Sequence, residues 1–247
     1  MAEARFFVLS AKDSMKRRLK INGFIIFIVA LLIVLFPAVV FRKASGSFFN
    51  GIMKIIGIAF ILLGQIFRAS ARGYKSENSQ EGLFLLRSGP YAVSRNPMYL
   101  GILLIGLGIV SVLFKWWVLS AFLLLFILRY LPLIFKEEKK LSVLFPQAYQ
   151  DYQRSVPRIL PSLSMIATRE ISEYLPIKLP WLKKEIGSIL AVLFITLFLE
   201  SWEDIKNAGI RAYLFKEGTG ILVVIIFFIY LVGYLNRRTK NGVPNKG

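Results

Sequence analysis

The chain of 247 residues contains neither cysteine nor histidine. Without cysteine it has no disulfide, no thiolate nucleophile and no palmitoylation site. Without histidine it has no Ser-His-Asp triad, no histidine-ligated metal and no histidine acting as a general base near neutral pH. We therefore expect no metal site. Acidic residues are also few, with 14 Asp and Glu against 32 Lys and Arg, which gives a net charge of +18.

Apolar residues make up 56% of the chain, and its mean hydropathy is +0.61. This is too apolar for an ordinary soluble domain. A helix needs roughly 20 apolar residues to cross a bilayer, and six stretches approach that length, the last two being the shortest. We therefore expect an all-α, multi-pass membrane protein with about six spans, at Gly23–Phe41, Phe48–Phe67, Met98–Phe114, Trp116–Phe135, Ile186–Leu199 and Gly220–Leu235.

The basic residues are distributed unevenly between the two sides of these predicted spans. Of the Lys and Arg residues outside the spans, 24 lie in the two tails and in the loops 68–97 and 136–185, and 6 lie in the other loops. By the positive-inside rule, both termini and these two loops face the cytoplasm. The excess charge thus predicts a bacterial inner-membrane protein that contacts membrane lipids, and it does not indicate nucleic acid.

Two polar, aromatic-rich blocks lie at the cytoplasmic ends of predicted spans. The first, GPYAVSRNPMYLG, covers Gly89–Gly101 and runs into the third span. Pro97 suits the first turn of a helix, and Asn96 suits the N-cap before it. The second block, EEKKLSVLFPQAYQDYQRSVPRILP, covers Glu137–Pro161. On a helix, adjacent Glu137 and Glu138 point to different sides.

The two blocks, in this order and spacing, resemble the integral-membrane methyltransferases that include isoprenylcysteine carboxyl methyltransferase and the phospholipid N-methyltransferases. In that family, a G-x-Y-x-x-x-R-H-P-x-Y-x-G block and an E-E-x-x-L-x-x-x-F-G block that continues to V-P-R build the S-adenosylmethionine site. The resemblance covers about residues 51–161. The chain departs from the family pattern at Asn96, where the family has histidine, and at Pro146, where it has glycine.

The resemblance implies which residues contact S-adenosylmethionine. Among the carboxylates we expect Glu138 to hold the ammonium of the cofactor, and we name it as a catalytic candidate together with Arg129, which lies within the fourth span. Arg129 either holds a carboxylate of the ligand or extends to the headgroups. The predicted cofactor residues are Tyr91, Arg95, Asn96, Pro97, Tyr99, Gly101, Glu137, Glu138, Leu141, Tyr149 and Tyr152.

Two further sets of residues have alternative interpretations. Arg154 and Arg158, four residues apart, are candidates for binding lipid phosphate or an anionic substrate, and the alternative is that they only obey the positive-inside rule. Gly57 and Gly64 lie seven residues apart, as do Gly101 and Gly108. We favour close packing between membrane helices for these glycines, the other interpretation being close approach around a cofactor.

The predicted function is methyl transfer from S-adenosylmethionine to a lipophilic or membrane-presented substrate, such as an isoprenylcysteine carboxylate or a phospholipid. Two alternatives stay open: an NADPH-dependent membrane reductase of the sterol type, and a non-catalytic membrane scaffold or transporter. We expect residues 1–161 to form the methyltransferase core. Residues 162–247 are expected to add an interfacial segment, 162–185, and two more spans.

Overall fold

The computed structural model describes residues 31, 35–42, 48–79, 84–161, 170–208 and 218–241. The chain forms two compact units, residues 1–43 and residues 44–247. In the first unit, Pro37–Val40 forms a short helix, α2. The regular elements in the described ranges are all helices, which confirms the predicted all-α class.

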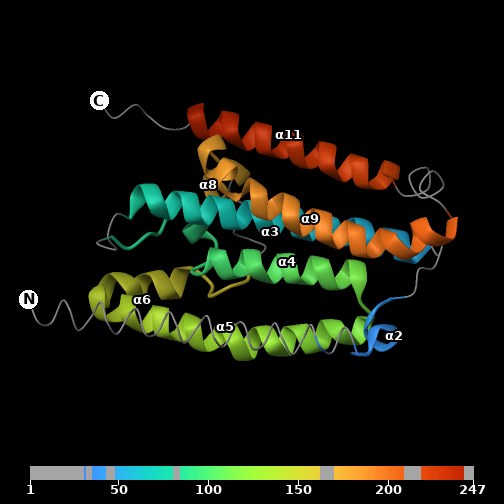
Figure 1. Cartoon of the computed structure of the whole chain (residues 1–247). Coiled ribbons are helices and arrows are strands. Elements are labelled where there is room, and N and C mark those ends of the chain that lie inside the picture. The colour runs from blue at the N-terminus through green and yellow to red at the C-terminus, as the bar shows by residue number, and fades with distance from the viewer. Residues whose placement is uncertain are drawn as a thin grey trace, which may run out of the picture. The chain divides into compact units, whose positions relative to one another are not determined.

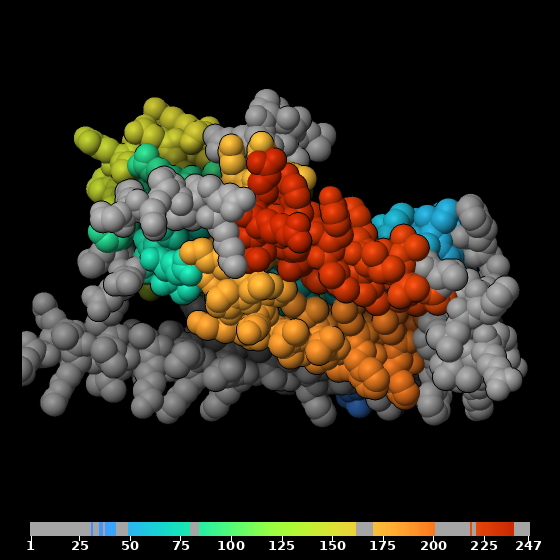
Figure 2. Space-filling model, turned by 90° about the horizontal axis from the view of Figure 1, so that it is seen from above, coloured from blue at the N-terminus to red at the C-terminus, as the bar shows by residue number. Residues whose placement is uncertain are grey.

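Five long helices build the second unit: α3 (Phe48–Asn78), α4 (Pro97–Leu113), α5 (Trp116–Leu144), α9 (Leu179–Ala208) and α11 (Thr219–Asn241). They lie side by side along a similar direction (Figure 1). The central helix is α3, which packs against α4, α9 and α11, while α5 packs on the far side of α4. Figure 2 shows the outer side chains of α11 next to those of α9.

Three helices in the described ranges are long and apolar enough to cross a membrane: Phe49–Asn78, Trp116–Leu144 and Ile221–Thr239. They correspond to the second, fourth and sixth predicted spans. The predicted number of six is not confirmed. The third predicted span forms α4, an apolar helix of 17 residues, the fifth lies inside the 30-residue α9, and most of the first lies outside the described residues.

The contact between α3 and α4 depends on glycine. A Cβ atom added to Gly101 would lie 2.7 Å from the carbonyl oxygen of Gly64, and one added to Gly108 would lie 2.4 Å from that of Gly57. Real Cβ atoms do not approach backbone so closely, so only glycine lets these backbones meet. The favoured interpretation, in which the glycines spaced seven apart serve helix packing, agrees with these contacts.

Prolines begin the helices that shape the functional end of the molecule. Pro97 is the first residue of α4, and Pro146 is the first residue of α6 (Pro146–Ser155). Their missing N–H groups would have no helical partner at this position. The boundary between the third and fourth predicted spans also agrees with the structure, because α4 ends at Leu113 and α5 begins at Trp116, with Lys115 between them. The motif residues on α4, α5 and α6 therefore meet at one end of the antiparallel pair formed by α4 and α5.

The C-terminal part packs onto α3 through a buried segment. Short helix α8 (Ile171–Tyr174) precedes α9, and Tyr174, Leu175 and Ile177 form a buried apolar cluster with residues of α3, α11 and the first motif loop. The backbone N–H groups of Ile177 and Leu179 donate to Thr239 Oγ1 and Asn236 Oδ1, which holds the end of this segment against α11. The interfacial position expected for residues 162–185 stays a prediction. Residues 162–169 of that segment lie outside the described residues.

Candidate functional site

Asn96 joins the two motif blocks. It occupies the N-cap position of α4, as predicted, but its side chain makes no cap hydrogen bond. Its amide Nδ2 instead donates to Glu138 Oε1 at 3.3 Å and to the carbonyl oxygen of Arg158 at 3.0 Å. The side chain therefore connects residues that lie 42 and 62 positions further along the chain, which corrects the expectation that it satisfies an orphan amide of its own helix.

Glu138 is the centre of this cluster. It lies in the C-terminal part of α5 and is 5% exposed. The Nε of Arg158 donates to both carboxylate oxygens, at 3.2 and 3.1 Å, and Arg158 Nη2 lies 3.1 Å from Oε2. Arg95 Nη1 lies 3.2 Å from Oε1. Two guanidinium groups and one amide thus surround a single buried carboxylate, which leaves the cluster with an excess positive charge.

Arg95 has donors that no described group satisfies. Its side chain is 10% exposed, and its Nε and Nη1 are buried without a hydrogen bond, as is the hydroxyl of Tyr149. The ion pair with Glu138 is therefore close but not aligned as a hydrogen bond. Because buried polar groups are nearly always hydrogen-bonded, these orphaned atoms point to a polar ligand or an ordered water between Arg95 and α6.

A buried apolar cluster lies beside these polar atoms. Tyr149, Tyr152 and Val156 form a buried cluster, against which Leu141 and Phe145 pack. The Tyr152 hydroxyl donates to the carbonyl oxygen of Tyr91 at 2.6 Å, so α6 is tied to the first motif loop. Burial, and then the charge of Glu138, raises the pKa of Tyr149. The phenol therefore stays neutral and able to donate a hydrogen bond.

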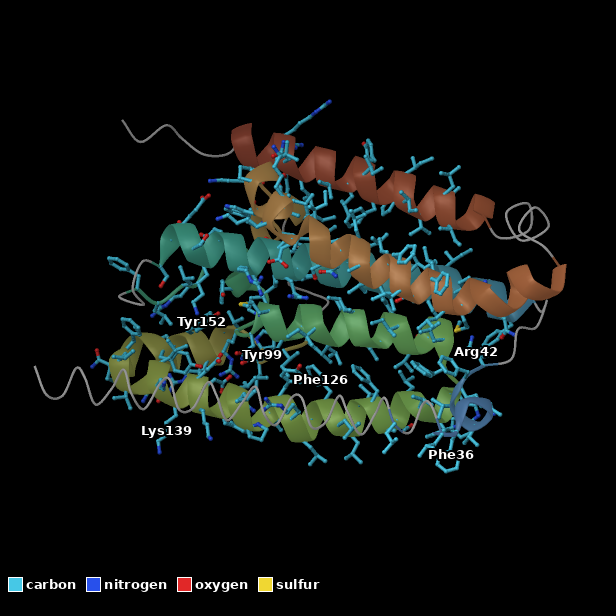
Figure 3. The ribbon with its side chains drawn as sticks, in the orientation of Figure 1. Phe36, Arg42, Tyr99, Phe126, Lys139 and Tyr152 are labelled. Carbon is cyan, nitrogen blue, oxygen red and sulfur yellow. The ribbon has the colours of Figure 1, made fainter. Side chains whose placement is uncertain are left out.

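The two adjacent carboxylates have different environments, as the helical geometry predicts. Glu137 is exposed and accepts a hydrogen bond from the Tyr99 hydroxyl at 2.9 Å. Tyr99 also packs against Tyr130 of α5, with ring centroids 5.6 Å apart. Figure 3 shows Tyr99 at the start of α4, whereas Lys139 of α5 points away from α4. Only Glu138 of this glutamate–lysine run is buried.

Four other predicted residues have different surroundings. Pro97 is buried at the start of α4. Gly101 faces α3, where an added Cβ would lie 2.6 Å from Arg68 Cγ, so helix packing accounts for this glycine. Arg129 is half-buried within α5, and Arg154 is exposed on α6. The structure therefore brings Arg95, Asn96, Glu138, Tyr149 and Arg158 together and leaves Arg154 exposed.

The sequence did not predict how Arg158 is used. It was expected at a lipid or substrate, but it binds Glu138 with two donors and lies over the Phe135 ring at 4.5 Å. The N–H of Arg95 also donates to the carbonyl oxygen of Pro157 at 2.9 Å. The signal that could have revealed this pairing is the V-P-R string that ends the second block, whose backbone is extended at Val156.

The chemistry of these groups fits the amino-acid half of S-adenosylmethionine. A guanidinium with free donors and a neutral phenol can hold a carboxylate, and the tyrosine cluster offers an apolar surface for a flat ring. The polar groups do not suit a metal ion. The described residues include no group of three or more carboxylates that could hold one, and the chain has no histidine or cysteine.

Comparison with known proteins supports the resemblance. The chain is similar to the cobalt-zinc-cadmium resistance protein CzcN of Cupriavidus metallidurans, with 26% identity over 163 residues that cover 64% of this chain and 69% of that protein. No solved structure matches the chain. The sequence pattern of the phospholipid methyltransferase family matches residues 51–148. The matched segment contains the first motif block and Glu138, and it confirms the predicted resemblance to integral-membrane methyltransferases.

Proposed function

We propose that this protein transfers the methyl group of S-adenosylmethionine to a lipophilic or membrane-presented substrate. The observation that carries the proposal is the convergence of the two motif blocks on one buried cluster, in which Asn96 of the first block bonds to Glu138 and to the Arg158 carbonyl of the second. The match of residues 51–148 to phospholipid methyltransferases supports the same reaction class.

Arg95 and Tyr149 are the residues that we assign to the carboxylate of the cofactor. Both are buried, and both have polar atoms without a hydrogen-bond partner among the described residues. Glu138 holds Arg95 and Arg158 in place, so we assign it first a positioning function. Its predicted contact with the cofactor ammonium remains a prediction, as do the ligand contacts of Tyr91, Tyr99, Glu137 and Arg129.

When bound, the cofactor supplies a methyl group on a sulfonium, which leaves as a neutral thioether while the methyl carbon bonds to the substrate nucleophile. For such a displacement the protein contributes proximity and alignment, worth about 7–11 kcal/mol of the barrier. An anionic carboxylate or thiolate of the substrate needs no general base. That chemistry suits a chain without histidine, since proton abstraction near neutral pH most often uses one.

Calorimetry on the purified protein in detergent tests the proposal. We expect binding of S-adenosylmethionine and of its demethylated product, and no binding of NADPH. Arg95→Ala should weaken cofactor binding roughly ten- to a thousandfold, because it removes a charged contact from a water-poor site. Arg154→Ala removes the same charge from the exposed face of α6 and serves as the matched control.

The other outcomes distinguish the alternatives. Binding of NADPH without S-adenosylmethionine would replace the proposal with a membrane reductase, and binding of neither would favour a scaffold or transporter. Equal losses from Arg95→Ala and Arg154→Ala would refute the assigned contact.

We also propose that this site faces the cytoplasm in a bacterial inner membrane, because the basic residues gather in the motif loops and tails. The naturally cysteine-free chain allows a direct test by labelling of single cysteines. Gln150→Cys on α6 should react only from the cytoplasmic side, and Trp116→Cys, at the opposite end of α5, only from the other side. The reverse pattern would overturn the orientation.

A further inference from the structure

A second buried carboxylate lies between α3 and α9, outside the segment that matches the methyltransferase family. Glu185 of α9 is 4% exposed. Arg72 of α3 donates a hydrogen bond to its Oε1, and Arg68 Nη2 lies 3.8 Å from its Oε2. At that distance Arg68 is an ion-pair partner but not a hydrogen-bond donor. Two guanidinium groups thus share one carboxylate, and only one of them is firmly bonded to it.

Arg68 and Arg72 carry one positive charge more than Glu185 balances, and Glu77 of α3 does not pair with them. Glu77 already binds Lys178 and the indole of Trp181, at 2.5 and 2.6 Å. The side chain of Arg68 is 22% exposed and that of Arg72 is 52% exposed, so both can be reached from outside. The end of α3 therefore presents accessible guanidinium groups with one positive charge in excess.

Gln65 provides an independent observation on the same helix face. It precedes Arg68 by three residues and Arg72 by seven, so the three side chains lie along one face of α3. Gln65 is fully buried, and neither its Nε2 nor its Oε1 has a hydrogen-bond partner among the described residues. A buried amide with both atoms unpaired is costly, and it is expected where a ligand supplies the missing partners.

Arg68 packs between α3 and the helices next to it, α4 and α9. Its Cγ lies against Gly101, where an added Cβ would meet it at 2.6 Å. Arg68 therefore lies in contact with the start of α4 and reaches toward α9. The outer side of α9 beside Glu185 is apolar and exposed at Ile186 and Leu190. A ligand here would meet cations at one end and an apolar surface at the other.

We propose that Gln65, Arg68 and Arg72 form a binding site for an anionic oxygen group, the phosphate of an amphiphile, between α3, α4 and α9. Basic pockets between membrane helices on the cytoplasmic side are suited to anionic lipid headgroups. The phosphate pairs with Arg68 and Arg72, and a headgroup with both a donor and an acceptor satisfies the Gln65 amide. The site shares no side chain with the Glu138 cluster, although Gln65, Arg68 and Arg72 lie within residues 51–148 and Arg68 lies against Gly101 of the first motif block.

Native mass spectrometry of the full chain tests the site, with phosphatidylglycerol and phosphatidylcholine as the two lipids offered in detergent. We expect preferential retention of phosphatidylglycerol and about a tenfold loss of that preference in Arg68→Gln. Gln65→Leu should also lower the preference. Arg237→Gln removes an exposed charge from α11 and should leave it unchanged.

Glu185→Gln gives the opposite change and separates binding from folding. It removes the carboxylate that competes for both arginines, so retention of phosphatidylglycerol should rise, by about tenfold if one ion pair is released. The double variant Arg68→Gln/Glu185→Gln avoids an unpaired buried carboxylate and should fold while still binding less than Glu185→Gln alone. A fall in retention for Glu185→Gln would overturn the site.

Inorganic phosphate distinguishes the source of the anion. If phosphate raises the thermal stability of delipidated protein as much as phosphatidylglycerol does, and Arg68→Gln abolishes both effects, the site takes a free anion as well as a lipid. If Gln65→Leu keeps the lipid preference and raises the melting temperature, the buried amide binds no ligand and the proposal is refuted. Equal losses of lipid preference in Arg68→Gln and Arg237→Gln would refute it as well.

Discussion

Glu138 and Glu185 are both buried carboxylates with two arginine partners, yet their surroundings differ. Glu138 receives hydrogen bonds from Arg158 and Asn96 in addition to its ion pair with Arg95. Glu185 has one hydrogen bond, from Arg72, and a looser ion pair with Arg68. The first carboxylate is enclosed by residues of the two motif blocks, whereas the second lies beside guanidinium groups that remain partly exposed.

The Glu138 cluster is built by the two sequence motifs, whereas the Glu185 cluster is not. The motif residues fix hydrogen bonds between neighbouring helix ends, where each donor has a defined acceptor. The Glu185 cluster arises where a later helix packs across α3, and its arginines keep donors available. An enclosed carboxylate organises cations, while a partly open cluster can exchange its carboxylate for another anion.

Removal of each carboxylate should give the largest difference between the two clusters. Glu138→Ala leaves Arg95 as a buried, unpaired cation, which typically costs about 3–5 kcal/mol. Glu185→Ala leaves Arg68 and Arg72, both of which reach water, so we expect a loss nearer 1–2 kcal/mol. Thermal unfolding in detergent measures both, with exposed Glu137→Ala as the control below about 1 kcal/mol. Equal losses for Glu138→Ala and Glu185→Ala would contradict the comparison.

Gly101 lies between the two clusters and should respond next most strongly. A Cβ in Gly101→Ala meets Arg68 Cγ and the Gly64 carbonyl oxygen, and overpacking of this kind costs about 1–3 kcal/mol. Gly187→Ala on α9 meets nothing within 4 Å, so it should stabilise by up to about 1 kcal/mol through helix propensity. Melting temperatures in detergent report both changes.

A third variant shows whether the effect of Gly101 reaches Arg68. Gly108→Ala disturbs the same pair of helices at Gly57 and Ile61, away from either cluster. We expect it to lower the melting temperature like Gly101→Ala but to leave phosphatidylglycerol retention unchanged. Loss of retention in both variants would indicate that general helix packing, and not the position of Arg68, controls lipid binding.

The smallest expected effect is an alkaline loss of stability that comes from the tyrosines on the Glu138 side. Burial raises the pKa of Tyr91 and of Tyr152 above the ordinary value of 10.0. The unfolded chain therefore loses these protons before the folded chain does, so their contribution is complete below about pH 10 and declines as the pH rises further. Tyr152→Phe should reduce this decline, as followed by tyrosinate absorbance and melting temperature. An unchanged pH dependence would contradict the assignment.

Much of the fold could be predicted because hydropathy and proline positions act locally. Pro97 and Pro146 are the first residues of α4 and α6, and Lys115 is the charged residue between the two apolar runs that form α4 and α5. The span count could not be predicted in the same way. Residues 186–199 form part of a 30-residue helix, with Glu185 buried just before them and Glu200 half-buried just after them. Both glutamates pair with basic residues of α3, and hydropathy along the sequence does not register such pairing.

The sequence predicted which residues belong to the candidate site better than it predicted the contacts between them. Helical spacing placed Glu137 and Glu138 on different sides of α5, and in the structure Glu138 is buried while Glu137 is exposed. Spacing could not reveal that the Asn96 amide leaves its own helix, or that Arg158 binds Glu138, because both contacts depend on how the chain returns after α6. The Glu185 cluster has no motif, since its partners come from α3 and α9 in different parts of the sequence.

The ion pair between Lys54 of α3 and Glu200 of α9 has a consequence for the order in which this protein is assembled. Lys54 is 8% exposed, and its acidic partner is synthesised only after most of the chain has left the ribosome. The α3 helix therefore gains this ion pair only after α9 has been made, so the packing of the helix that precedes the first motif block depends in part on the C-terminal part of the chain.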